Sequence, residues 1–88
     1  MAKVLVTLYV QAPKGNGYTT PRAMKRVDDH LRQDASANMK CPPPSGMPVQ
    51  EEDGTWEVRI YNANLAEYVK YILKNHYGLE IVREVKHD

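Results

Sequence analysis

The sequence predicts an α+β domain in which strands and helices follow one another in the order β-α-β-β-α-β. Segments that alternate between apolar and polar side chains lie near both ends of the chain, over 3–11 and 79–86. Two further strand-like arms flank the pair Asp53-Gly54. Two other segments, 20–35 and 64–77, carry apolar residues at helical spacing. The two patterns differ because side chains repeat every two residues along a strand and about every 3.6 along a helix.

The first strand is expected over 3–11, which is rich in β-branched residues. One face carries Val4, Val6, Leu8 and Val10. The other face carries Leu5, Thr7 and Tyr9. Residues 12–19 then contain a proline, two glycines and an asparagine, and we expect an irregular loop there.

The first helix is expected from Thr20-Pro21 to about Ala35, because threonine is a favourable N-cap and proline suits the first helical position. Its apolar stripe consists of Ala23, Met24, Val27 and Leu31. Residues 36–48 lack periodicity and include three consecutive prolines, which exclude a helix. We expect a second irregular connection over 36–48.

A hairpin is predicted from 49–52 and 55–62, because Asp-Gly accepts the positive φ angles of tight turns. The second arm directs Trp56, Val58 and Ile60 to the core. A second helix follows, with Asn64 and Glu67 as a capping box and Gly78 at its end. The last strand, 79–86, is expected to place Leu79, Ile81 and Val85 on the core face and Glu80, Val82 and Glu84 on the other.

This order of elements resembles the ferredoxin-like sandwich over the whole chain. The resemblance implies one domain, 1–88, with a four-stranded antiparallel sheet and both helices on one of its faces. The first and third strands are central in such a sheet. Folds of this kind carry unrelated functions, so the function has to be argued from a site.

Composition narrows the classes of function. The formal charge is +1, from 12 basic and 11 acidic residues, so the chain has no overall field that draws it to nucleic acid or to an anionic membrane. Its single cysteine, Cys41, cannot form an internal disulfide, and its N-terminal residues do not have the pattern of a signal peptide. We therefore expect a cytoplasmic protein that does not insert into a membrane.

The open face of the sheet is the predicted site. Its candidate partner-binding residues are Leu5, Tyr9, Glu57, Arg59, Tyr61 and Val82. Tyrosine and arginine beside apolar groups are typical of protein interfaces, so we expect a protein partner or a homodimer. Small proteins that act this way include phage-encoded inhibitors of host machinery, anti-CRISPR proteins among them.

The alternative for the same face is binding of single-stranded nucleic acid. Two tyrosines and an arginine on central strands resemble the RNA-recognition module (RRM), which stacks bases on aromatic side chains. The third strand, TWEVRIYN, lacks the glycine-aromatic pattern of that family. Three glutamates, Glu57, Glu80 and Glu84, are expected on this face and would repel phosphates.

A second alternative is a small phosphate-handling enzyme. The loop over 14–20 enters a helix N-terminus, where free N–H groups favour an anion. Its candidate anion-binding residues are Lys14, Gly15, Gly17, Thr20 and Arg22. The position resembles that of the phosphate cradle in acylphosphatases, whose glycine-rich sequence with an arginine is not reproduced here.

Catalytic and metal-binding patterns are otherwise missing from the sequence. Cys41, His30, His76 and His87 match no zinc-binding spacing. Cys41 also has no base near it in the sequence. We expect no metal, no cofactor and no enzymatic activity.

Overall fold

The computed structural model describes residues 4–12 and 21–87. Its strands are β1 (Val6–Gln11), β2 (Val49–Gln50), β3 (Trp56–Ile60) and β4 (Glu80–Lys86), and its helices are α1 (Pro21–Asp34) and α2 (Ala66–Tyr71). Both helices continue into a π-helical turn, Ala35–Met39 after α1 and Ile72–His76 after α2. A short 3-10 turn, Ala63–Leu65, precedes α2.

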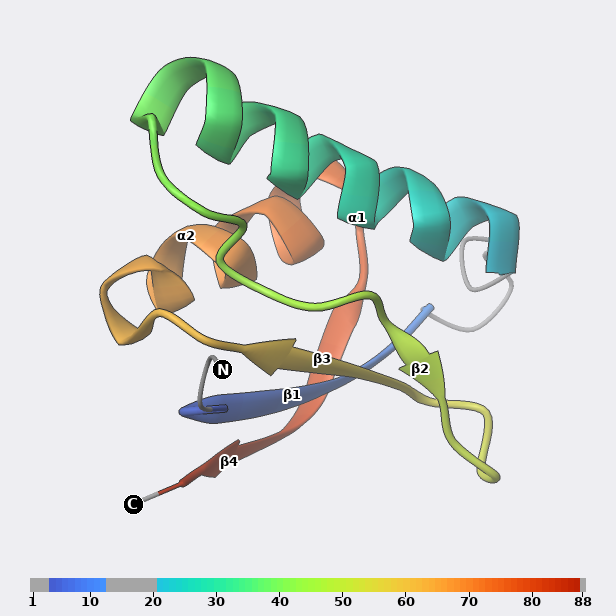
Figure 1. Cartoon of the computed structure of the whole chain (residues 1–88). Helices are drawn as coiled ribbons and strands as arrows, with labels where there is room; N and C mark the ends of the chain where they lie inside the picture. Colours follow the sequence, from blue (N-terminus) through green and yellow to red (C-terminus); the bar gives the residue numbers. More distant parts are fainter. Residues whose placement is uncertain (1–3, 13–20, 88) are drawn as a thin grey trace.

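The four strands form one antiparallel sheet in the order β2-β3-β1-β4. Strands β1 and β3 are central, and both helices lie on the same face of the sheet (Figure 1). The α+β class, the four-stranded antiparallel sheet and the order β-α-β-β-α-β are therefore confirmed. Within the described residues, the other face of the sheet carries no helix (Figure 1).

The core lies between the sheet and the helices, and it uses the residues that the alternation and the helical spacing indicated. Leu8, Val10, Val58 and Ile60 are fully buried on the sheet side. Trp56 is 5% exposed, so its prediction as a core residue is confirmed. The helices contribute Met24, Val27, Leu31, Val69 and Leu73.

The connection between α1 and β2 differs from the prediction in two ways. Residues 36–39 are helical, because α1 continues through its π turn and ends at Lys40, whose φ of 53° is left-handed. Cys41 N donates to Ala35 O at 3.1 Å across this end. The rest of the connection runs along the edge of β3: Tyr61 N donates to Pro44 O at 2.8 Å, and Gly46 N donates to Arg59 O at 3.0 Å.

The hairpin turn differs from the expectation in the backbone angles of Asp53-Gly54. Only Gly54 takes a positive φ, 90°, and Gly54 N donates to Glu51 O at 3.1 Å. Asp53 keeps a negative φ and instead accepts bonds at its Oδ1 from Thr55 N and Thr55 Oγ1, at 3.0 and 2.6 Å. The pair therefore forms the hairpin by a capping carboxylate followed by a left-handed glycine.

Asn64 is not the N-cap of the second helical segment, which begins with the 3-10 turn Ala63–Leu65 and continues as α2 from Ala66. Asn62 is the N-cap of that 3-10 turn, and its side chain accepts from Asn64 N at 3.0 Å. Glu67 contacts Lys70 Nζ at 3.2 Å and so does not complete a capping box. Gly78, with a φ of 66°, does follow the helical segment, as predicted.

Candidate binding surface

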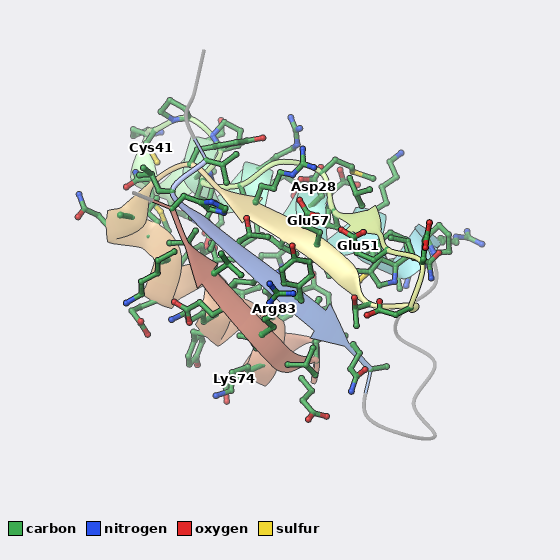
Figure 2. The ribbon with its side chains drawn as sticks, turned by 90° about the horizontal axis from the view of Figure 1, so that it is seen from below. Asp28, Cys41, Glu51, Glu57, Lys74 and Arg83 are labelled. Carbon is green, nitrogen blue, oxygen red and sulfur yellow. The ribbon has the colours of Figure 1, made fainter. Side chains whose placement is uncertain are left out.

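Two of the predicted side chains, Tyr9 and Glu57, lie opposite each other on the open face of the sheet. Tyr9 pairs with Glu57 of β3 and with Arg83 of β4, and Thr7 pairs with Arg59 of β3 and Val85 of β4. Residues directly opposite in antiparallel strands point to the same face. Figure 2 shows this face from below, with Glu57 and Arg83 on it.

A β-bulge in β4 changes which of its residues reach the open face. Ile81 pairs with Val10 and Arg83 pairs with Tyr9, so Val82 has no partner residue in β1. One extra residue reverses the alternation of the residues that follow it. The prediction that Glu84 lies on the open face is therefore wrong, and Val85 lies on the open face although it was assigned to the core.

The bulge also gives Glu84 and Arg83 different partners from those expected. Glu84 opposes Leu8 on the helix face, where Lys70 Nζ of α2 contacts its Oε1 at 2.7 Å. Arg83 takes the open position, and its guanidinium carbon lies 5.1 Å from the centre of the Tyr9 ring. This distance is within the range of a cation–π contact. The open face thus has one glutamate fewer and one arginine more than the sequence predicts.

A charged cluster lies beside Tyr9, with Glu57 and Arg59 on β3 and Glu51 directly after β2. Arg59 Nε donates to Glu57 Oε1, and the Glu57 side chain is only 13% exposed. A hydrogen bond with Glu51, followed by the bond from Arg59, lowers the pKa of Glu57. The bond with Glu57 and then burial raise the pKa of Glu51. Glu51 is therefore the carboxyl of this pair that keeps a proton more readily, and Glu57 is the anion that holds Arg59.

The remaining predicted partner-binding residues divide between the two ends of the face. Val82, 43% exposed, lies with Tyr9 and Arg83 around a shallow hollow next to the hairpin. Leu5 and Tyr61 line a separate hollow at the far end. Residues Pro42, Pro43, Asn62, Ala63 and Asn64 complete that second hollow. The six residues therefore do not form one continuous aromatic platform.

Thr7 lies between the two ends. Its side chain is bonded to His87, with Oγ1 2.8 Å from Nε2. Thr7 is 4% exposed on this face, where its cross-strand partners are Arg59 and Val85. The hydrogen bond between Thr7 and His87 therefore lies between the Tyr9 end of the surface and the Leu5 end.

The proposed anion loop lies largely outside the described residues. Lys14, Gly15, Gly17 and Thr20 are among those not described. Arg22 is exposed in the first turn of α1, which begins at Pro21 as predicted. The anion-binding hypothesis therefore stays a prediction.

A cluster on the helix side was missed by the sequence reasoning. His30 Nδ1 lies 2.9 Å from Tyr77 Oη, and the rings of His30 and His76 lie edge to face with centroids 4.5 Å apart. Nearby, Tyr68 Oη donates to Asp34. Burial first, and then this bond, raise the pKa of Tyr68, while the bond lowers the pKa of Asp34. The sequence held one indication of this cluster: His30 and His76 each lie next to the buried apolar stripe of their helical segment.

Within 4–12 and 21–87, no three His, Cys, Asp or Glu side chains are grouped so that they could hold a metal ion. In the same residues no helix is long and apolar enough to cross a membrane. No protein-family model matches the chain, and neither does any curated protein or solved structure.

Proposed function

We propose that this protein is a non-enzymatic binding protein that holds a protein partner against the open face of its sheet. The observation that carries the proposal is the Tyr9–Arg83 pair beside the Glu57–Arg59 ion pair, on the sheet face opposite the helices. Tyrosine and arginine supply large contact area and directed hydrogen bonds, and they are common anchors of protein interfaces. The proposal includes assignment of the fold to the ferredoxin-like sandwich, which the strand order supports.

The charges on this face favour a partner with mixed polarity. The ion pair and the cation–π pair hold their side chains in place before binding, which lowers the entropy lost on association. Exposed apolar groups, Val82 and Val49, lie on the same sheet at 43% and 49% exposure. A small inhibitor that occludes a surface of its target, such as a phage-encoded anti-CRISPR protein, would use a face of this kind.

The test is capture of partners by the intact chain and by three single variants: Tyr9→Ala, Arg83→Ala and Arg59→Ala. We expect a partner that is retained by the wild type and weakened at least about tenfold by Tyr9→Ala or Arg83→Ala, which is typical of an interface anchor. Lys25→Ala, on the exposed side of α1, is the matched control and should bind like the wild type. Equal affinity in all three variants would place the binding surface elsewhere.

Binding of single-stranded nucleic acid is the second candidate, and the bulge in β4 favours it. By removing Glu84 from the open face and placing Arg83 over Tyr9, the bulge leaves this face less acidic than expected. A base that stacks on Tyr9 has to displace the Arg83 guanidinium from the ring, and the displaced guanidinium can then bind a phosphate of the same strand. A titration with a short oligonucleotide should then show affinity that falls steeply with salt and is lost in Tyr9→Ala. No binding at low salt excludes this candidate.

A further inference from the structure

The outer edge of β4 is the longest unpaired edge among the described residues. β4 is the terminal strand in the order β2-β3-β1-β4 and has seven residues, and within 4–12 and 21–87 no other strand pairs with its far side. Unpaired N–H and C=O groups on such an edge can bind another strand. The opposite edge, β2, has two residues, and prolines at 42–44 and 48 interrupt the segment before it.

We propose that β4 pairs in antiparallel fashion with β4 of a second copy of this chain, about a twofold axis at Val85. The inference concerns the edge of the sheet and does not rest on the proposed function of its open face. The second copy is the favoured occupant because the edge is complementary to itself in charge. Glu84 of one copy can lie opposite Lys86 of the other in a register that the backbone of β4 allows.

The backbone of β4 limits the registers that such a pair can take. His87 N donates to Leu5 O at 2.8 Å, so its N–H points toward β1. N–H groups alternate in direction along a strand, so Val85 also points inward while Glu84 and Lys86 point outward. The hydrogen-bonded pairs between two copies must therefore be formed by Glu84 and Lys86.

Two registers centred on this part of β4 form such pairs, and charge favours one of them. One places Glu84 opposite Glu84, which is unfavourable because like charges directly opposite repel. The other places Glu84 of each copy opposite Lys86 of its partner copy, twice, with Val85 opposite Val85. Lys70 Nζ, 2.7 Å from Glu84 Oε1, already holds that carboxylate on the helix face. The second register is the one we propose.

The bulge limits the length of this interface. Because Val82 reverses the alternation, faces match between two copies only from Arg83 onward. The regular pairing therefore spans 83–87, and we expect a weak dimer that forms with rising concentration. Paired residues share a face, so the helices of both copies lie on one side. The open faces then form one continuous surface.

The test is sedimentation of the intact chain at increasing protein concentration, with charge variants. Lys86→Glu places glutamates opposite Glu84, and Glu84→Lys places lysines opposite Lys86. Each variant should self-associate about tenfold more weakly than the wild type, since two attractive pairs become repulsive. An equimolar mixture of the two variants should form a heterodimer, because each glutamate pair then faces a lysine pair. That recovery also shows that both variants are folded.

Two further measurements locate the interface. Lys25→Glu makes the same charge change on the exposed side of α1 and should leave the dimer unaltered. Amide hydrogen exchange at Glu84 and Lys86 should slow as the concentration rises, and exchange at Val85 should not. A chain that stays monomeric at every concentration overturns the proposal, and so does a dimer that all variants form equally.

Discussion

Leu8 and Tyr9 are adjacent in β1, but their environments differ. Leu8 is fully buried beneath the helices, whereas Tyr9 lies on the open face against the guanidinium of Arg83. The helix face of the sheet holds a continuous apolar core, and the open face holds paired charges with a few apolar groups between them. The contrast teaches that one strand can supply stability and a binding surface separately, because consecutive side chains point to opposite faces.

Leu8→Ala should have the largest effect on stability. The cavity left in the core lowers the free energy of unfolding by about 3 kcal/mol, which is typical of a buried leucine. Urea denaturation followed by circular dichroism measures the change. Tyr9→Ala is the matched control on the neighbouring residue, and it should cost less than about 1 kcal/mol. Equal losses in the two variants would contradict the division between the faces.

Gly46→Ala should have an intermediate effect. A Cβ at this position would lie 2.5 Å from the Oη of Tyr61, so the end of that ring must move. We expect a loss of about 1 kcal/mol, because a flexible ring can give way. In a Tyr61→Ala background the same substitution should cost nothing measurable. If the cost persists there, the strain does not come from Tyr61.

Tyr68→Phe tests a polar contact on the helix side and should leave the open face unaffected. Loss of the hydrogen bond should raise the pKa of Asp34, which NMR titration can follow. The folded-state pKa of Asp34 is lowered, so the bond from Tyr68 stabilises the fold fully above the unfolded pKa of about 4. This stabilisation is lost as the pH falls through the folded-state pKa. The stability difference between wild type and variant should therefore shrink in acid. An unchanged Asp34 titration would contradict this.

Arg83→Ala should have the smallest effect on stability. An exposed cation–π contact contributes about 0.5 kcal/mol, so the melting temperature should hardly change. The same substitution should weaken partner binding strongly if the proposed function is correct. A large loss of stability without a loss of binding would show that Arg83 serves the fold.

The sequence predicted the elements well where periodicity alone decides them. The alternation in 3–11 and 55–60 identified Leu8, Val10, Trp56 and Val58 as buried, and Pro21 marked the start of α1. Local pattern was insufficient at the ends of both helices, because apolar spacing does not show the π turns that extend them or the left-handed Lys40. It also failed in β4, because the bulge at Val82 is visible only in the pairing with β1.

The candidate surface was predicted where its strands alternate regularly and was missed where the bulge interrupts β4. Tyr9 and Glu57 share the open face because their strands alternate regularly. The bulge adds one residue to β4, so the predicted alternation missed Arg83 and assigned Glu84 to the wrong face. The contact of His30 with His76 and Tyr77 joins α1 to the end of the second helical segment, and spacing along one helix cannot show such a contact.

Trp56 offers a further use of the separation between the faces. It is the chain's one tryptophan, it pairs with Val10, and it is 5% exposed on the helix side. Its fluorescence should therefore respond to loss of the core and remain constant when a ligand covers Tyr9. Tryptophan emission can report unfolding while the NMR resonances of the Tyr9 ring report occupancy of the open face, so both equilibria can be followed in one sample without an added dye.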